Sequence, residues 1–368
     1  MKTVIFLRTP SDRSQPHVKR FLLVTNDYPP RVGGVARYHS AIIGALGAQA
    51  SVLVVKIERG WIWLLPKIIF TLIRTRADAL IVGEITPIGT LALILRRTIG
   101  IPYVVVCHGL DLRLAARVSR RCKIAKAVLR GASRIIVNSA MTAALARDLD
   151  APAKHVTIVP PPLGVIPELA RPAYVYDVRT KFDLENVRIV LSVGRLVARK
   201  GFDDLIRAFA IIQRTRPRTA LVIIGDGPER MALEEIGRNE HVAVRFLSHR
   251  SDAEVAAWYT ACDVFALLPR ELPNGDVEGF GIVYLEAGAF EKPVVGTQSG
   301  GVPEAIMDGE NGLLVPPNDP TAAATAISRI LADGALAARL GTNGARRVQR
   351  EFSAERFAER IRGALDGA

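Results

Sequence analysis

The chain has few of the features that mark several common protein classes. It contains 3 cysteines in 368 residues, and their wide spacing at Cys107, Cys122 and Cys262 fits neither a disulfide framework nor a cysteine metal cluster. Aromatic residues make up 6% of the chain and offer few stacking platforms for nucleic acid. We therefore expect a protein of a reducing compartment that binds no nucleic acid.

Long apolar segments are also scarce. The apolar stretch at residues 61–73 is too short for a bilayer-spanning helix, which needs about 20 residues. We interpret it as a buried crossover helix rather than a helix lying on a membrane surface. Near the N-terminus, Arg8 and Pro10 interrupt a short apolar run, so no secretory signal peptide is expected. These absences favour a cytoplasmic location.

Positive charge is abundant and unevenly distributed. Residues 1–160 contain 24 Lys and Arg against 8 Asp and Glu, a net charge of +16. Residues 161–368 contain 25 against 28, a net charge of −3. The basic first half predicts an anionic partner there, such as a membrane surface or a lipid phosphate. A length of 368 residues is comfortable for two domains of ordinary size.

Strand-like runs alternate with helix-length segments in both halves, which is typical of parallel sheets covered by helices on both faces. Ser251 and Glu254 form a capping box at the start of one expected helix, residues 251–261. A proline-rich linker is predicted at residues 160–179. The strands that we expect are residues 21–25, 51–57, 79–82, 103–107, 134–137, 156–159, 187–193, 220–224 and 293–296.

Two glutamates and two glycines stand out between residues 278 and 286. We expect residues 279–282 to form the first turn of a helix, where unpaired backbone N–H groups bind anions and where Gly279 and Gly281 leave room for a ligand. Glu278 and Glu286 would then lie two helical turns apart on one side of the helix. This arrangement suits a ligand rich in hydroxyls that also carries phosphate. The alternative is a glycine-started helix with two solvated acids.

Other loops between expected strands and helices could also bind phosphate. Gly33 and Gly34 follow the first expected strand and allow close backbone approach, although glycine pairs also serve tight turns. A second loop begins at Gly194 and carries Arg195 and Lys200. Fixed cations there would stabilise a departing diphosphate without a metal ion.

Residues 113–130 read as one amphipathic helix with a basic surface. Leu114, Val118, Cys122, Ala125 and Leu129 form an apolar stripe at helical spacing. The rest of the surface is expected to be an uncompensated basic face for an anionic surface, or else an ordinary solvated face. Its cations are Arg113, Arg117, Arg120, Arg121, Lys123, Lys126 and Arg130.

Several of these motifs resemble those of a known enzyme family. Residues 278–304, with Ser299-Gly-Gly-Val-Pro-Glu304, and residues 309–315 resemble the donor-binding half of the family 4 retaining glycosyltransferases. Residues 24–34 resemble the N-terminal loop of the same family, particularly of bacterial phosphatidylinositol mannosyltransferases. The resemblance covers most of residues 21–320. It implies the α/β GT-B fold, in which two Rossmann-like domains flank a central cleft and the C-terminal helix crosses back to the N-terminal domain.

The resemblance also implies roles for individual residues. Glu278 would contact the donor sugar and Glu286 the nucleotide ribose, while Arg195 and Lys200 would bind the donor diphosphate. His108 would reach the donor sugar and the β-phosphate, and the neighbouring Asp111 receives no defined role. The donor-binding residues would be Gly33, Gly34, Gly194, Gly225, Gly279, Phe280, Gly281, Ile282, Val283 and Glu286.

These expectations combine into one functional hypothesis. Residues 1–165, including a basic extension at 1–20, would form the acceptor-binding domain, residues 166–350 the nucleotide-sugar domain, and residues 351–368 the returning helix. The enzyme would move a mannosyl or glucosyl group from a GDP- or UDP-linked sugar to a lipid-linked or glycan acceptor at the inner membrane face, without a metal or cofactor. The alternatives are a sugar-nucleotide epimerase, a non-catalytic nucleotide-sugar-binding protein and a transferase with a soluble acceptor.

Overall fold

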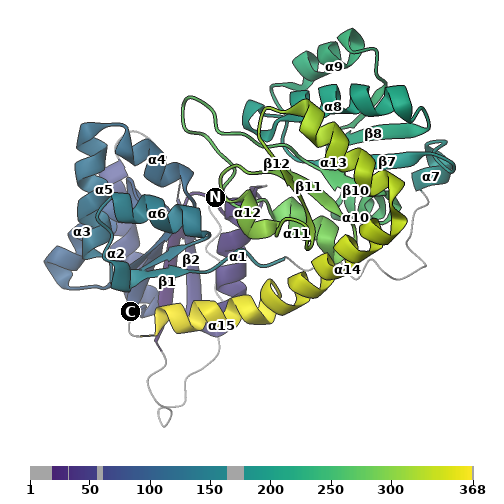
Figure 1. The fold of residues 1–368 in the computed structure, drawn as a ribbon. Helices are drawn as coiled ribbons and strands as arrows, with labels where there is room; N and C mark the ends of the chain where they lie inside the picture. The colour runs from purple at the N-terminus through teal and green to yellow at the C-terminus, as the bar shows by residue number, and fades with distance from the viewer. Residues whose placement is uncertain (1–18, 32, 56–60, 164–177, 367–368) are drawn as a thin grey trace. The chain divides into compact units, whose positions relative to one another are not determined.

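The computed structural model describes residues 19–31, 33–55, 61–163 and 178–366 (Figure 1). The chain divides into two compact units, unit 1 with Met1–Gly164 and Ala354–Ala368, and unit 2 with Val165–Ser353. Each unit contains a six-stranded parallel sheet with helices on both faces (Figure 1). The α/β architecture and the parallel sheets are therefore confirmed. Most of the predicted basic extension and linker lies outside the described residues.

The strands of unit 1 are short and almost wholly apolar because helices cover both faces of the sheet. Every residue of β1 and of β4 is buried. Parallel pairing aligns Phe21 of β1 with Ala50 on one side and Ala79 on the other. The strands, in sheet order, are β2 (Ala50–Val54), β1 (Phe21–Thr25), β3 (Ala79–Val82), β4 (Tyr103–Cys107), β5 (Arg134–Val137) and β6 (Val156–Ile158).

Two apolar clusters hold the helices of unit 1 against opposite faces of its sheet. One cluster joins the sheet to α2, α3, α5 and α6, and the other joins it to α1 and α15. Phe357 and Ile361 anchor α15, so the last helix of the chain packs on unit 1 as the GT-B expectation requires. The helices are α1 (Gly34–Leu46), α2 (Leu64–Thr75), α3 (Ile88–Ile99), α4 (Leu110–Ala116), α5 (Ser119–Gly131), α6 (Ala140–Asp148) and α15 (Ala354–Leu365).

Unit 2 repeats this plan with its own sheet. In sheet order its strands are β12 (Gly312–Val315), β11 (Val294–Thr297), β10 (Val264–Ala266), β7 (Arg188–Val193), β8 (Thr219–Ile224) and β9 (Val244–Leu247). Its helices are α7 (Val178–Lys181), α8 (Phe202–Thr215), α9 (Arg230–Asn239), α10 (Asp252–Ala261), α11 (Ile282–Ala289), α12 (Val302–Ala305), α13 (Pro320–Ala332) and α14 (Gly334–Glu351). The capping box of Ser251 and Glu254 at the start of α10 is confirmed.

The strand order of each sheet identifies where a ligand would bind. In unit 1 the order reverses between β1 and β3, and in unit 2 it reverses between β7 and β10. Loops that leave two such strands at their carboxyl ends diverge to opposite faces of the sheet and leave a crevice between them. The loops after β1 and β3 and those after β7 and β10 are therefore the first places to look for function.

The predicted single helix over residues 113–130 is wrong. The segment forms two helices, α4 and α5, because the backbone of Val118 is extended, with φ −112° and ψ 116°. The apolar stripe is consequently broken, since Leu114 and Val118 are 47% and 46% exposed while Ala125 and Leu129 are buried.

The apolar stretch at residues 61–73 is only partly buried, which corrects the prediction of a buried helix. It does form a crossover helix, α2, between β2 and β3, after a short 3₁₀ turn. Ile68 and Leu72 pack into the core of unit 1. Trp63, Phe70 and Ile73 remain 81%, 62% and 73% exposed. This helix therefore presents an apolar face to solvent.

Candidate functional site

The reversal of strand order in unit 2 brings two predicted motifs together. The loop after β7 begins at Gly194 and ends with Lys200, and the segment after β10 leads to Glu278. Lys200 Nζ lies 2.6 Å from Glu278 Oε2, and the Nη1 atom of Arg199 lies 2.9 Å from the same oxygen. Side chains separated by 79 residues in sequence thus form one charged cluster.

Arg199 is a site residue that the sequence analysis missed. Its guanidinium contacts Asp276 through Nε at 3.2 Å and Glu278 through Nη1, so it links the end of the β10–α11 segment to the β7–α8 loop. The signal was present in the sequence, because Arg199 directly precedes Lys200. The sequence does not indicate that both adjacent cations face the same carboxylate, because this depends on the local turn, here a short 3₁₀ helix at Ala198–Lys200.

The electrostatics of the cluster keep Glu278 ionised. Burial raises the pKa of this carboxyl, but the charges of Lys200 and Arg199 and their hydrogen bonds outweigh it and lower the pKa to about 2. The carboxylate can therefore accept hydrogen bonds from ligand hydroxyls throughout the physiological pH range. It cannot supply a proton as a general acid there.

A second arginine, Arg270, links the segment after β10 to the β7–α8 loop through hydrogen bonds outside the charged cluster. Arg270 donates from its backbone N–H to the Arg199 carbonyl at 2.9 Å and from Nε to the Ala198 carbonyl at 3.3 Å. Its guanidinium also pairs with Asp203 and Asp204 at the start of α8. These bonds hold the site in position without using Lys200 or Glu278.

The Ser299-Gly-Gly motif supports Glu278 from the other side. The N–H of Gly301 donates to the Glu278 carbonyl at 2.9 Å. A Cβ on Gly301 would lie 2.2 Å from the Gly279 carbonyl oxygen, and one on Gly300 would lie 2.3 Å from that of Glu278. No side chain fits at either position, so these glycines let the two backbones pack directly together.

Helix α11 begins at Ile282, three residues later than predicted. Gly281 is its N-cap, with φ 93°, a conformation that favours glycine. Glu278 therefore lies before the helix, and the predicted helical geometry between Glu278 and Glu286 is wrong. Phe280 is also 3% exposed and packs edge-on against Phe352, with ring centroids 5.7 Å apart. Any contribution of Phe280 to donor binding must come from its backbone.

Glu286 lies on α11 and is positioned by a tyrosine that the sequence analysis missed. The hydroxyl of Tyr259, on α10, donates to Glu286 Oε2 at 2.9 Å. The Tyr259 ring stacks on Phe290 with centroids 5.6 Å apart. Ile282 and Val283, both half-buried, occupy the first turn of the same helix. A single element thus carries three of the predicted donor-binding residues.

The remaining predicted residues of unit 2 lie in the turns after β7 and β8. A Cβ on Gly225 would lie 2.0 Å from the Gly194 carbonyl oxygen, so the two predicted glycine turns contact each other through their backbones. Arg195 follows Gly194 and is exposed. Lys200 and Glu278 are paired, whereas no ion pair of Arg195 is seen among the described residues.

Unit 1 carries the other predicted residues. Gly33 and Gly34 are exposed at the start of α1. His108 follows β4 and is half-buried. Asp111 now has a defined structural role, because its Oδ1 accepts the backbone N–H groups of His108 and Gly109 at 3.1 and 3.0 Å. Burial raises the pKa of Asp111 to about 6, although the backbone bonds oppose this.

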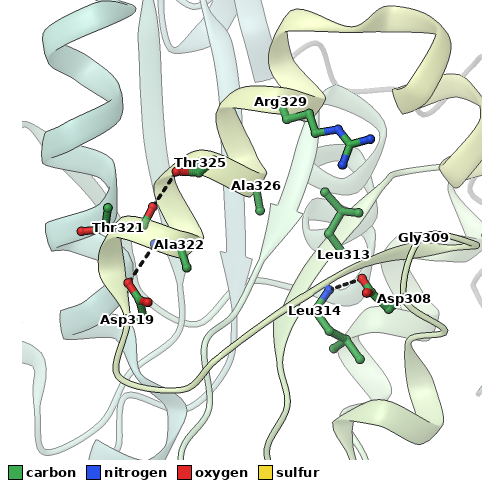
Figure 2. A pocket seen from close by; sticks show the side chains of 10 residues that line it. All are labelled: Asp308, Gly309, Leu313, Leu314, Asp319, Thr321, Ala322, Thr325, Ala326 and Arg329. Atoms are coloured by element: carbon green, nitrogen blue, oxygen red, sulfur yellow. Dashed lines mark hydrogen bonds between the residues drawn. The ribbon is translucent and has the colours of Figure 1, made fainter.

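A separate hollow of about 610 Å³ lies between the β12 segment and α13, and none of the predicted site residues lines it (Figure 2). Its polar groups serve the fold. Asp319 accepts the Ala322 N–H at 2.8 Å to cap α13, and Asp308 accepts the Leu314 N–H at 2.9 Å (Figure 2). This hollow is therefore not the site that the sequence predicts for the donor.

Comparison with known proteins agrees with the geometry. Residues 17–162 match the glycosyl transferase 4-like domain, and residues 178–347 match glycosyl transferases group 1. The chain is 31% identical to a GDP-mannose-dependent alpha-(1-6)-phosphatidylinositol monomannoside mannosyltransferase of Mycolicibacterium smegmatis, over 93% of this chain and 96% of the relative. It belongs to the family 4 retaining glycosyltransferases. A GDP-mannose-dependent monoacylated alpha-(1-6)-phosphatidylinositol monomannoside mannosyltransferase of Corynebacterium glutamicum is 27% identical, over 94% of this glycosyltransferase and 98% of the relative.

Solved structures show the fold of this glycosyltransferase to be GT-B. HepE of Anabaena, solved in complex with UDP, superposes with a TM-score of 0.81 at 21% identity over 95% of this chain and all of the other. A sucrose-phosphate synthase of Thermosynechococcus elongatus gives a TM-score of 0.77 at 25% identity, over 95% of this chain and 98% of the other. The protein is thus a nucleotide-sugar-dependent glycosyltransferase, and retention at the anomeric carbon fits its family.

Two further features concern metals and membranes. Within the described residues, no group of three or more His, Cys, Asp or Glu side chains could hold a metal ion. Metal-independent transfer remains an expectation. No helix in the described ranges is long and apolar enough to cross a membrane.

Proposed function

We propose that this glycosyltransferase moves a mannosyl group from GDP-mannose to a lipid-linked acceptor at the inner membrane face, with retention of configuration. The names of the mannosyltransferases of M. smegmatis and C. glutamicum support the donor and the glycolipid class of acceptor. Their similarity spans nearly the whole chain, so it includes the unit that would hold the acceptor. A glucosyl donor and a soluble acceptor are the alternatives that the experiments below distinguish.

The observation that carries the proposal is the cluster of Lys200, Arg199 and Glu278 at the carboxyl edge of the unit 2 sheet. Arg199 and Lys200 are balanced by Glu278 and Asp276, so the cluster places a cation directly beside a carboxylate that can bind sugar hydroxyls. A diphosphate that departs from the sugar develops negative charge, and fixed cations stabilise that charge in the transition state. Lys200 and Arg195 would bind the diphosphate, Glu278 the sugar and Glu286 the ribose.

The reaction needs no protein nucleophile in this proposal. The bond between the anomeric carbon and the phosphate oxygen breaks, and the acceptor oxygen forms its bond to the same face of that carbon. The acceptor proton passes to the departing phosphate oxygen, so charge and atoms balance. The protein contributes positioning and electrostatic stabilisation.

The donor and acceptor are tested by binding and transfer in excess EDTA. A nucleotide sugar at 100 times its Kd should stabilise the protein by ~2.7 kcal/mol, measured as a rise in unfolding temperature. We expect this for GDP-mannose and not for UDP-glucose or ADP-glucose at equal concentration. Transfer should occur to vesicles that contain a phosphatidylinositol mannoside and not to a soluble mannose oligosaccharide. Stabilisation by UDP-glucose alone, transfer only to the oligosaccharide, or a need for Mg²⁺ would each contradict the corresponding part of the proposal.

We also propose that one sheet face of unit 1 binds the anionic membrane. Helices α2, α3 and α5 cover this face together (Figure 1). The basic face of α5 is smaller than predicted, because Asp150 pairs with Lys126 at 3.1 Å and with Arg130 at 2.7 Å. Arg120, Arg121 and Lys123 stay exposed, with no ion pair to any described residue.

The apolar side chains of α2 strengthen this assignment. Phe70 and Ile73 on α2 are exposed, as is Trp63 at the end of the 3₁₀ turn before it, and Trp is favoured at membrane interfaces. Cations near anionic lipid each contribute about 1 kcal/mol, and buried apolar surface adds to this. A face with both features suits a lipid surface better than a soluble acceptor.

Vesicle co-sedimentation tests the membrane face. We expect wild type to pellet with anionic vesicles at low salt, less at high salt and little with neutral vesicles, because the Debye length falls from about 10 Å at 0.1 M to about 3 Å at 1 M. Changing Arg120, Arg121 and Lys123 to Glu should abolish pelleting. The matched control makes the same change of charge in unit 2, at Arg214, Arg218 and Arg238. Equal loss in both triple variants, or equal pelleting with neutral vesicles, would refute the assignment.

A further inference from the structure

His39 is a fully buried residue that the predicted site did not include. It lies on α1, with 0% of its surface exposed. Its Nδ1 atom lies 2.9 Å from the backbone carbonyl oxygen of Asp27 and 3.1 Å from Thr25 Oγ1. Its Nε2 atom lies 3.3 Å from the Nε2 atom of His108. A line of polar contacts thus runs from the backbone after β1 to the ring of His108.

The first contact determines which nitrogen of His39 carries the proton. A backbone carbonyl oxygen can only accept a hydrogen bond, so the Nδ1 atom of His39 must donate to Asp27. Thr25 Oγ1 is compatible with this assignment, because it can accept from the same N–H and donate to Glu84 Oε1, which lies 3.3 Å away. In a neutral imidazole the other nitrogen, here Nε2, is then an acceptor.

The contact between the two Nε2 atoms then determines which nitrogen of His108 carries the proton. Two imidazole nitrogens at 3.3 Å form a hydrogen bond only if one of them carries a proton, and His39 Nε2 does not. His108 Nε2 must therefore be the donor, which leaves the Nδ1 atom of His108 as an acceptor. Burial lowers the pKa of both rings, and that of His108 lies well below 6.5, so both are neutral near pH 7.

The surroundings hold both rings in place. A Cβ on Gly83 would lie 2.5 Å from His39 Cε1, so the backbone after β3 packs directly on the His39 ring. Tyr38 contacts the His108 ring edge-on, with centroids 5.1 Å apart, and its hydroxyl donates to the Val159 carbonyl at 2.7 Å. In the part of the chain that the structure describes, His108 uses its backbone N–H and its Nε2 atom in hydrogen bonds, not its Nδ1 atom.

We propose that His39 is a positioning residue that holds His108 in the Nε2–H tautomer, so that the Nδ1 atom of His108 accepts a hydrogen bond from a sugar hydroxyl. This inference rests on the proposed function. It also refines the expectation for His108, because a neutral Nδ1 acceptor cannot donate to a β-phosphate oxygen. The imidazole of His108 thus recognises a hydroxyl and not the diphosphate.

The tautomers can be observed directly. Long-range ¹H–¹⁵N correlation spectra of protein labelled with ¹⁵N-histidine distinguish protonated from unprotonated ring nitrogens. At pH 7.5 we expect a proton on Nδ1 of His39 and on Nε2 of His108, with signals assigned from His39→Gln and His108→Gln variants. The opposite tautomer of His108 overturns the proposal. The wild-type spectrum decides this point even if a variant does not fold.

Kinetics of two variants test whether the tautomer serves the reaction. His39→Gln retains a side-chain oxygen that can accept from His108, so its kcat should stay within about 10-fold of wild type. His39→Leu removes the acceptor, and we expect kcat to fall about 10- to 100-fold, as for other residues that orient a functional histidine. A folded His39→Leu variant that keeps both the Nε2–H tautomer and full kcat overturns the proposal.

The inference and the proposed function fail in different ways. If the tautomers are as expected but His108→Ala turns over normally, the tautomer of His108 does not contribute to the reaction and this inference is wrong. The proposal of sugar transfer is unaffected by that result. If no nucleotide sugar supports transfer, the proposed function is wrong, and so is any role of the His108 tautomer in transfer. The ¹⁵N spectrum still decides which tautomer His39 imposes.

Discussion

Changing Lys200 to Ala is expected to lower kcat about 10²-fold or more while the protein stays folded. The Lys200 side chain lies 2.6 Å from Glu278 and is 12% exposed. Little water can therefore take over its stabilisation of the negative charge that develops on the departing diphosphate. Arg195→Ala should reduce kcat on the same scale if Arg195 also binds the diphosphate. The measurement is steady-state transfer from a saturating nucleotide sugar, with unfolding temperature as the check on folding.

Two control variants separate this effect from a general loss of charge. Lys292 donates to the Thr260 carbonyl at 2.8 Å in the same unit, and Lys292→Ala should keep near-normal kcat. Arg199→Ala should give a smaller loss than Lys200→Ala, because the proposal places Lys200 and not Arg199 against the departing diphosphate. Near-normal turnover of both Lys200→Ala and Arg195→Ala would exclude the assigned role in neutralising the leaving group.

Changing Glu84 to Gln is expected to stabilise the protein increasingly as pH rises. Burial raises the pKa of Glu84 from 4.5 to about 7, and Asp27 and Asp111 add to this, although the Asn26 N–H and the Thr25 hydroxyl oppose it. Its Oε2 atom is buried without a hydrogen-bond partner among the described residues. The folded state therefore binds a proton that the unfolded state releases between about pH 4.5 and 7, so wild type loses stability over that range.

Glutamine cannot ionise, so the variant escapes this loss. It can still accept the Asn26 N–H through its side-chain oxygen. Its advantage in unfolding free energy should grow by about 2.5 kcal/mol between pH 5 and pH 8 and level off above pH 7. Denaturant unfolding at several pH values measures this, with the exposed Glu359→Gln as control. A constant difference between variant and wild type across this range would show that Glu84 ionises normally.

The fold and many of its elements could be predicted because their signals are local. Runs such as residues 103–107 and 134–137 are apolar at every buried position, and their alternation with helices leaves few arrangements besides a covered parallel sheet. The capping box at Ser251 was predicted for the same reason, since its two side chains lie three residues apart. Family motifs then indicated the donor-binding half.

Predictions failed where one local sequence pattern was compatible with more than one tertiary structure. The spacing of Leu114, Val118 and Cys122 fits a helix, yet an extended Val118 separates α4 from α5. The run of cations on α5 contained no acid, but Asp150 reaches it from the end of α6. Charge compensation by a residue 20 or more positions away cannot be read from the composition of one helix.

The amino-acid order alone predicts the strands of unit 1, three strands of unit 2 (β7, β8 and β11) and the candidate residues for a diphosphate sugar, because hydrophobic period and glycine placement act over a few residues. Only the tertiary structure decides which side chains those residues contact. Arg199 joins Lys200 at Glu278 because the strand order reverses between β7 and β10. His39 meets His108 because α1 and β4 pack at the same edge of one sheet, 69 residues apart in the chain. Protonation states follow from such contacts, since desolvation and hydrogen bonding act through space and not along the sequence.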